Sequence, residues 1–513
     1  MEASVQDERT APEELREAAA HGVRWSAIVR PAIEVLQLAS IVVLARLIVP
    51  AEFGRFAVAL IAQEVAFQVV AGGFGAALVQ RKSLTRAHEQ TGMALGLATG
   101  ACLGLLVLLL ASLVVDPVFG ARTASFVRLM APLCLVSAFS VVPMATLRRR
   151  MDFRRLSTIE FSSTLTRVGA SVALAVAGLN GEALVLGVIA GSLVTAVLGW
   201  VSAPGPRPRF HRQESRELLG YSLPFSFATL SWVGFSNVDY AIIGARLGAV
   251  QTGLYYRAYT LAVEYQSKVS MVMTQVGFPV LARANDEHEL EELHHKMVRM
   301  LTILIFPLLA LLAVGAPVLV PLCFGPHWSG AVAPVQILAI GGASVVAIDA
   351  AGTVLMATGR TKALFGYGVA HFLSYGLAVF VAAGHGIVAV AVAGSVTHTA
   401  FLAVAYFLII RDAAETPMRR LVSDLAPATV SSLALVAVAV PLGAGLTALG
   451  LPSIPWLVAL GLGAVGPYLL TLRLIFPSTW QDQRHAFARI IPWHPRLPRR
   501  LTRAKLAGDE APA

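Results

Sequence analysis

Several charged side chains interrupt long apolar stretches of this sequence, where an ionised group is energetically costly and usually has a function. Arg30 and Glu34 stand four residues apart, so on a helix they share one face, and Glu264 and Lys268 repeat this spacing. A guanidinium can hold phosphate through two hydrogen bonds, whereas an ammonium acts as a mobile point charge. We therefore expect a solvated cavity whose cationic side chains attract an anionic group. Its candidate residues are Arg30, Glu34, Gln37, Glu64, Glu160, Arg167, Asn237, Asp239, Glu264, Lys268 and Asp349.

The charged residues at helical spacing allow two interpretations. In the first, Arg30, Arg167 and Lys268 face the cavity and bind its anionic contents. In the second, each oppositely charged pair neutralises itself along its helix, or the charged tips reach toward water. Because charges rarely face lipid, the first interpretation is slightly favoured, but the sequence leaves both open.

Three acidic residues have no partner close to them in the sequence. Glu64, Asp239 and Asp349 are therefore candidates for binding protons or sodium ions, or else they are protonated packing residues. His371 and His398 each stand alone in an apolar stretch. That placement favours histidines satisfied within the core over a pH switch.

The composition defines the class of protein. The chain has 513 residues, of which 56% are hydrophobic and 14% charged, with a mean hydropathy of +0.71. A soluble chain carries about 25% charged residues. Apolar stretches of about 20 residues recur, which is the length that a helix needs to cross a bilayer. The sequence therefore predicts an all-α polytopic membrane protein, because backbone groups in lipid must be bonded within their own segment.

About fourteen transmembrane spans are predicted. They cover residues 25–48, 56–79, 92–115, 125–147, 158–178, 182–202, 220–245, 254–280, 298–322, 331–356, 364–383, 387–410, 424–448 and 453–475. Loops after even-numbered spans carry 20 Lys and Arg residues, whereas loops after odd-numbered spans carry about six. This asymmetry predicts that both ends of the chain lie in the cytoplasm. It also accounts for the net charge of +10 without a nucleic-acid partner.

A short motif between spans occurs twice. Leu44-Ala-Arg-Leu is followed by a loop, Gly54 and an aromatic residue, and Gly244-Ala-Arg-Leu is followed in the same way by Gly253. Looser matches follow at offsets near 200 residues, which predicts a duplicated unit. Because each copy has six spans, the copies enter the membrane in the same sense and are parallel repeats. The outer-rim candidates, which either anchor lipid headgroups or gate the site, are Arg46, Arg246 and Arg257.

The repeat and the composition together divide the chain into segments. The predicted segments are a cytoplasmic N-terminal segment (1–24), a first lobe with spans one to six (25–202), a proline-rich cytoplasmic linker (203–217), a second lobe with spans seven to twelve (218–411), spans thirteen and fourteen (412–476) and a basic cytoplasmic tail (477–513).

Motifs in the first 410 residues carry a family resemblance. They are Leu44-Ala-Arg-Leu with Pro50-Ala-Glu-Phe-Gly-Arg-Phe56, Gly75-Ala-Ala-Leu-Val-Gln-Arg81, Leu147-Arg-Arg-Arg-Met-Asp-Phe-Arg-Arg-Leu156, Gly253-Leu-Tyr-Tyr-Arg-Ala-Tyr259 and Phe324-Gly-Pro-His-Trp328. In order and spacing they resemble the polysaccharide branch, the Wzx-type flippases, of the multidrug/oligosaccharidyl-lipid/polysaccharide exporter superfamily. The resemblance implies a bacterial inner-membrane protein with two six-helix lobes and two extra helices.

The resemblance also implies a function. Such proteins move an undecaprenyl-pyrophosphate-linked oligosaccharide to the outer leaflet by alternating access, for exopolysaccharide, capsule or O-antigen synthesis. Implied partners are membrane lipids and a polysaccharide polymerase with its export machinery. Two alternatives stay open: a cation-coupled drug antiporter of the same superfamily and a lipid II flippase.

Neither an enzyme nor a nucleotide-driven pump is expected. The only lysine-containing stretch near a phosphate-binding pattern, Gly359-Arg-Thr-Lys362, lacks the spacing of a P-loop. The three cysteines have no paired spacing and predict neither a disulfide nor a metal site. Transport would then run downhill or on a proton or sodium gradient, and no other cofactor is expected.

Overall fold

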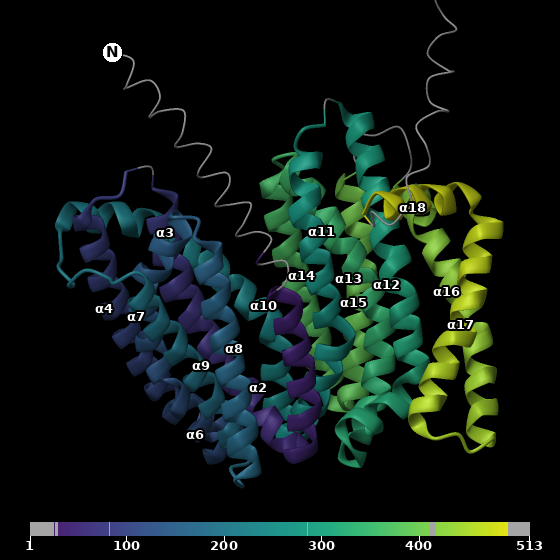
Figure 1. Cartoon of the computed structure of the whole chain (residues 1–513), viewed down its shortest axis with the longest axis horizontal. Helices are drawn as coiled ribbons and strands as arrows, with labels where there is room; N and C mark the ends of the chain where they lie inside the picture. Colours follow the sequence, from purple (N-terminus) through teal and green to yellow (C-terminus); the bar gives the residue numbers. More distant parts are fainter. Residues whose placement is uncertain (1–24, 26–28, 82, 285, 410–416, 491–513) are drawn as a thin grey trace, which may run out of the picture. The chain divides into compact units, whose positions relative to one another are not determined.

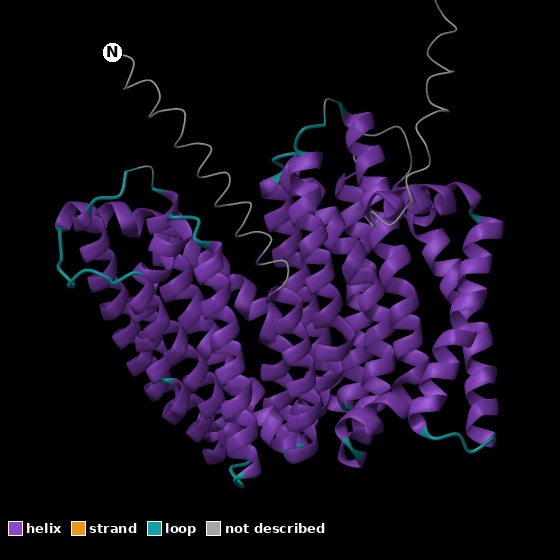
Figure 2. Ribbon diagram, viewed as in Figure 1, coloured by secondary structure: helices purple, strands orange, loops and turns teal. Residues whose placement is uncertain are grey.

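The computed structural model describes residues 25, 29–81, 83–284, 286–409 and 417–490. Every regular element in these ranges is a helix (Figure 2). The first helix occupies residues 29–47. The elements that follow, many of them labelled in Figure 1, are α2 Pro50–Ala66, η1 Phe67–Phe74, α3 Gly75–Gln80, α4 Arg86–Leu110, η2 Ala111–Val115, α5 Asp116–Phe119, α6 Ala121–Met130, α7 Pro132–Arg149, α8 Phe153–Val176, α9 Gly181–Ser202, α10 Arg212–Tyr259, η3 Thr260–Glu264, α11 Tyr265–Leu281, α12 Glu287–Phe324, η4 Pro326–Ala331, α13 Val332–Ala357, α14 Thr361–Ala382, η5 Ala383–His385, α15 Ile387–Ile409, α16 Pro417–Ala448, α17 Ser453–Ile475 and α18 Pro477–Ile490.

Among the described residues, 11 helical runs are long and apolar enough to cross a membrane. Some join several elements; α2, η1 and α3, for example, form one run from Pro50 to Gln80. The helix at 29–47 and α8 lie outside this set. The prediction of an all-α, multi-pass membrane protein is confirmed, and the exact number of spans stays a prediction.

The run through α10 contains a break where the sequence predicts a loop between two spans. Gly248 has φ 80° and ψ 176°, a backbone conformation that is essentially restricted to glycine. The chain re-enters a helix directly after it and continues through the π-helix η3 into α11. A single glycine therefore replaces a longer loop, since its freedom at positive φ lets the chain turn within one residue.

Contacts divide the chain into two compact units. One contains Met1–Tyr265, Ala316–Gly342 and Phe365–Ala400, and the other contains Gln266–Gly315, Ala343–Leu364 and Phe401–Ala513. The predicted segment and lobe boundaries stay predictions. The predicted N-terminal segment (1–24), the end of the second lobe near 410 and the tail beyond 490 lie outside the described residues.

Within the first unit, the two copies of the duplicated motif cross each other at their glycines. A Cβ atom built on Gly54 of α2 would lie 1.8 Å from the carbonyl oxygen of Ala249. A Cβ atom built on Gly253 would likewise lie 1.8 Å from the carbonyl oxygen of Pro50. This reciprocity is what a two-fold relation between the copies produces. The crossing therefore places a local pseudo-two-fold axis between Gly54 and Gly253.

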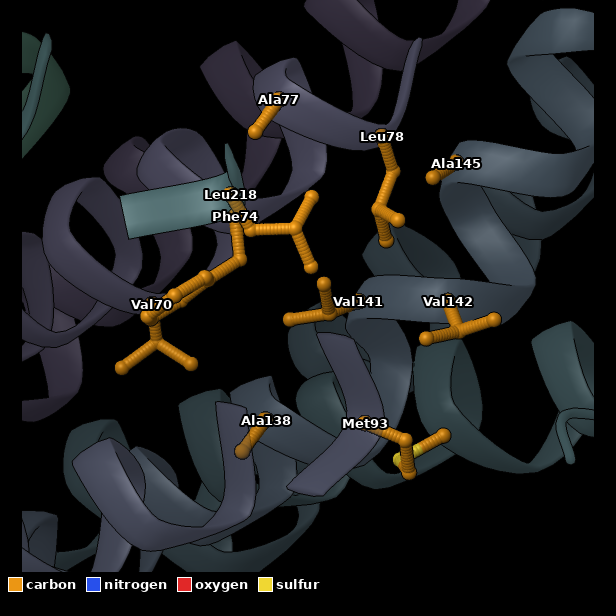
Figure 3. Close-up of a cluster of buried hydrophobic side chains, with 10 residues drawn as sticks. All are labelled: Val70, Phe74, Ala77, Leu78, Met93, Ala138, Val141, Val142, Ala145 and Leu218. Atoms are coloured by element: carbon orange, nitrogen blue, oxygen red, sulfur yellow. The ribbon is translucent and has the colours of Figure 1, made fainter. Parts of the chain in front are cut away.

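Apolar packing also holds the helices of the first unit together. Figure 1 shows α7, α8 and α9 side by side, and the close-up in Figure 3 shows the side chains that join η1 and α3 to α4, α7 and the start of α10. Phe74, Leu78 and Leu218 are each less than 5% exposed in this cluster. Burial of such side chains contributes about 2 kcal/mol each in water, and in lipid the contribution comes mainly from close packing.

A buried carboxylate joins the helices of the second unit. Asp424 of α16 is fully buried, contacts His295 of α12, and accepts a hydrogen bond of 3.0 Å from the hydroxyl of Tyr406 on α15. Nearby, the hydroxyl of Tyr468 on α17 donates to the carbonyl of Ile303 at 2.8 Å. These bonds attach the last two long helices to α12.

Candidate functional site

The predicted site residues Glu64 and Asn237 meet at the contact between α2 and α10. The side-chain nitrogen of Asn237 donates to the Glu64 carboxylate at 2.8 Å and to the carbonyl of Val233 at 3.0 Å. Asn237 is buried, whereas Glu64 is exposed at the end of α2, just before η1. Glu64 has no partner close to it in the sequence, but Asn237, 173 residues away on another span, supplies one. Asn237 thereby fixes the position of the carboxylate.

Two arginines extend this polar region. Arg257 is only 5% exposed, and its guanidinium lies 4.0 Å above the ring of Phe53. Arg167 of α8 is half-buried, with Glu264 and Tyr256 among its electrostatic neighbours. A face-on guanidinium over an aromatic ring is stabilised by the ring quadrupole. Both cations are thus held near the Glu264 carboxylate, which is also an electrostatic neighbour of Arg257.

Close helix packing positions Arg167. A Cβ atom on Gly191 of α9 would lie 2.9 Å from the Arg167 Cβ atom, and one on Gly187 would lie 2.8 Å from the Arg167 carbonyl oxygen. The two glycines let α9 approach the backbone of α8, as small residues do between membrane helices. This close packing fixes the backbone of Arg167, from which its long side chain extends.

We use the term polar cluster for a set of first-unit residues that are linked by contacts or by electrostatic range. The cluster carries charges of both signs, and Glu64 and Glu264 are exposed as whole residues. The Glu34 and Glu264 carboxylates share Tyr265 as an electrostatic neighbour. An arrangement of this kind can bind a polar, charged group while its partners balance the remaining charge. The members of the polar cluster are Glu34, Glu64, Arg167, Asn237, Arg257 and Glu264.

Other predicted cavity residues lie elsewhere. Arg30 and Glu160 are exposed on the helix at 29–47 and on α8, and Gln37 is half-buried. Lys268 and Asp349 are half-buried in the second unit. Their part in a substrate cavity stays a prediction.

The outer-rim candidates are placed differently from one another. Arg46 donates to the carbonyls of Leu322 and Cys323 at the end of α12. The guanidinium of Arg246 lies 3.6 Å over the ring of Phe380 and donates to that residue's carbonyl near the end of α14. Both arginines therefore satisfy carbonyls of the kind that a helix leaves unpaired at its C-terminus. Arg257, expected at the same rim, is buried and offers no exposed guanidinium to a headgroup.

Sequence reasoning missed a second polar group. His371 of α14 and His398 of α15, each expected to be a histidine satisfied within the core, share a hydrogen bond of 3.1 Å that the sequence did not reveal. Asp239 also has a partner, because the Tyr375 hydroxyl donates to it at 2.9 Å. One signal was available: the two histidines lie at nearly equal distances along the chain from the turn at His385. In a pair of antiparallel helices, residues at equal distances from the connecting turn lie at the same height along the two helices.

Metal chemistry finds no support in the described part of the chain. No group of three or more His, Cys, Asp or Glu side chains there could hold a metal ion. The polar cluster contains no activated nucleophile paired with a base, as covalent catalysis requires.

Comparison with known proteins assigns the family. The family model for "Polysaccharide biosynthesis protein" matches residues 43–333, more than half of the chain. The chain belongs to this family. This polysaccharide biosynthesis protein is 28% identical over 352 residues to the teichuronic acid biosynthesis protein TuaB of Bacillus subtilis, covering 67% of the chain and 72% of TuaB. It is 27% identical over 364 residues to the lipopolysaccharide biosynthesis protein WzxC of Escherichia coli K12, covering 69% of the chain and 73% of WzxC.

A solved structure shows the fold. The lipid II flippase MurJ in an inward closed conformation superposes with a TM-score of 0.69 at 12% identity, covering 88% of this chain and 99% of MurJ. The resemblance to Wzx-type proteins that the sequence motifs predicted is confirmed. The protein therefore shares the fold of this solved structure and belongs to a family named for polysaccharide biosynthesis.

Proposed function

We propose that this protein flips an undecaprenyl-pyrophosphate-linked oligosaccharide across the bacterial inner membrane by alternating access. The observation that supports the proposal is Arg167, whose backbone on α8 is fixed by the close approach of Gly187 and Gly191 on α9, in a chain of a polysaccharide biosynthesis family. Arg167 can hold a phosphate oxygen while the Glu64 and Glu264 carboxylates accept sugar hydroxyl groups. The lipid tail stays in the bilayer, so that only the headgroup needs a polar path.

The family and the relatives support this substrate class. TuaB and WzxC are named for the synthesis of teichuronic acid and lipopolysaccharide, which are both surface glycopolymers. We further propose the inner membrane as the location, both termini in the cytoplasm, and a polysaccharide polymerase with its export machinery as partners. No catalytic step is assigned to the chain.

A flipping assay tests the proposal. The full chain is reconstituted in vesicles with a fluorescent undecaprenyl-pyrophosphate-linked disaccharide, and flipping is measured as protection of the label from a membrane-impermeant quencher. We expect Arg167→Ala to lower the flipping rate at least about tenfold, because the loss of one charge-assisted hydrogen bond costs about 1.5–3 kcal/mol. Arg154→Ala is the matched control, since Arg154 is an exposed arginine at the start of the same helix.

Two outcomes would overturn the proposal in favour of the alternatives. Faster transport of lipid II than of the oligosaccharide probe would indicate a cell-wall flippase. Export of a cationic dye without any lipid flipping would indicate a drug antiporter. An unchanged rate in Arg167→Ala would remove Arg167 from the site even if the chain flips the probe.

A further inference from the structure

An open cavity lies at the first turn of α10, and none of its lining residues belongs to the polar cluster. It has a volume of about 430 Å³ and is lined by Arg212, Gln213, Arg216 and Glu217. That volume falls within the range of about 300–1,000 Å³ in which proteins hold small ligands. All four residues belong to the first unit, on the side that the charge pattern predicts to be cytoplasmic. We use the term α10 pocket for this cavity.

Two arginines determine the sign of the charge in the α10 pocket. Glu217 also lines the pocket, but its carboxylate contacts the guanidinium of Arg81 and, at 3.1 Å, the ring of His88. Arg212 and Arg216 are exposed, lie four residues apart on one face of the helix, and form no ion pair with any described residue. The pocket therefore offers two guanidinium groups whose charge no acid neutralises.

The backbone that carries these arginines is fixed. The N–H of His211, directly before α10, donates to the hydroxyl of Thr91 on α4 at 3.3 Å, and its ring bonds the Gln90 side chain at 3.1 Å. Leu218, directly after the pocket, is 1% exposed within the apolar cluster of Figure 3. Both ends of this helical turn are thus attached to other helices. A preformed site loses less entropy when a ligand binds, which favours affinity.

The α10 pocket suits an anion with several phosphate oxygens. A planar guanidinium can donate two parallel hydrogen bonds to one phosphate, so a pair of arginines matches the two phosphates of a pyrophosphate. A cation would be repelled by both arginines, and a neutral sugar would gain nothing from their charge.

We propose that the α10 pocket binds a pyrophosphate group and is the entry site at which the lipid-linked substrate first contacts the protein. This inference rests on the proposed flippase function and adds an entry step to it. The pyrophosphate of a lipid lies at the headgroup level of the leaflet, where the charge pattern places the start of α10. The substrate docks there by its pyrophosphate before it reaches Arg167. Free pyrophosphate has the same chemistry, so the experiments compare the two sources.

Binding of inorganic pyrophosphate to the full chain in nanodiscs tests the pocket itself. The titration is carried out at about 0.15 M salt, where interactions between distant charges are screened. We expect the double variant Arg212→Gln, Arg216→Gln to bind at least about tenfold more weakly than the wild type, because charge-assisted hydrogen bonds to both phosphates are lost. The matched control is Arg207→Gln, Arg209→Gln, since both arginines are exposed on the preceding linker and are not among the described lining residues. Equal affinities in the pocket variant and the control would overturn the proposal.

The flipping assay tests whether the lipid-linked substrate uses the pocket. In the pocket variant, the lipid concentration that gives half the maximal rate should rise at least about fivefold, while the maximal rate falls by less than about twofold. An unchanged half-saturating concentration, with tight pyrophosphate binding in the wild type, would assign the pocket to free pyrophosphate and overturn its role in entry. If the wild type flips no probe, the proposed function fails. The pyrophosphate titration then still decides whether the pocket binds this anion.

Discussion

Alanine at either glycine of the crossing between the duplicated motifs should destabilise the protein. At Gly54 the new methyl group would lie 1.8 Å from the Ala249 carbonyl oxygen and 2.8 Å from the Gly253 nitrogen. At Gly253 it would lie 1.8 Å from the Pro50 carbonyl oxygen. Real Cβ atoms essentially never approach closer than 3.0 Å, so the two helices must separate by more than an ångström.

The loss of stability depends on which atoms the new methyl group contacts. Overpacking typically costs about 1–3 kcal/mol when side chains can move aside. Here the contacted atoms belong to the backbone, which cannot change rotamer, so each single substitution should cost about 3 kcal/mol or more. Because the first methyl group already forces the helices apart, the second should add less. The double variant is therefore expected to be less destabilised than the sum of the two single variants.

Thermal unfolding in detergent, followed by size-exclusion chromatography with fluorescence detection, measures the loss. Gly169→Ala is the control, because no atom lies within 4 Å of its Cβ position and alanine favours the helix by about 1 kcal/mol. We expect Gly169→Ala to match or exceed the wild-type midpoint, and Gly54→Ala and Gly253→Ala to fall several degrees below it. Wild-type stability in both crossing variants would refute the reciprocal packing. Fully additive losses would refute the shared contact.

Two further substitutions separate packing from transport. Trp328→Phe should destabilise the fold by about 1–3 kcal/mol, because the fully buried indole donates to the Ala45 carbonyl at 2.8 Å and phenylalanine leaves that oxygen unpaired. Thermal unfolding measures this loss, and an unchanged unfolding midpoint would contradict the prediction. Arg246→Ala should lose only about 1 kcal/mol with no change in the flipping rate, because its cation–π contact with Phe380 is exposed. A severe flipping defect at normal protein level would instead assign Arg246 to a gate.

Much of the fold was predictable because lipid imposes strong rules. Apolar stretches long enough to cross the bilayer identified helices, and the repeated Ala-Arg-Leu motif identified a duplication that the structure shows at the Gly54 and Gly253 crossing. The glycine break at Gly248 was not predicted, since a loop and a one-residue turn separate two apolar stretches equally well. Periodicity also says nothing about π-helical segments such as η1, which change the face of a helix partway along it.

The partners within the candidate site were the least predictable part. Glu64 and Asp239 seemed unpartnered only because a sequence displays neighbours along one helix, whereas Asn237 and Tyr375 reach them from others. The two histidines were expected to be satisfied within the core, but for the same reason the sequence did not show that they bond each other. Arg257 was assigned to a rim from its place near a span end, yet the Phe53 ring draws it into the interior. Which side chains meet between two helices depends on how each helix is rotated about its axis and shifted along it, and composition does not determine either.

The duplication also accounts for the charge pattern of the polar cluster. Glu64 and Glu264 stand 200 residues apart, the same offset as Arg46 and Arg246, and the two carboxylates are electrostatic neighbours. A two-fold axis near the helix crossing brings equivalent residues of the two copies together, so a duplicated acid necessarily places like charges near each other. The copies then differ in how that repulsion is offset. Glu64 is held by the neutral amide of Asn237, whereas Glu264 has the guanidinium of Arg167 near it. Arg167 is an electrostatic neighbour of Glu264. If an anionic headgroup took the place of Glu264 beside Arg167, the charge of Glu264 would be less balanced and its repulsion of Glu64 would increase.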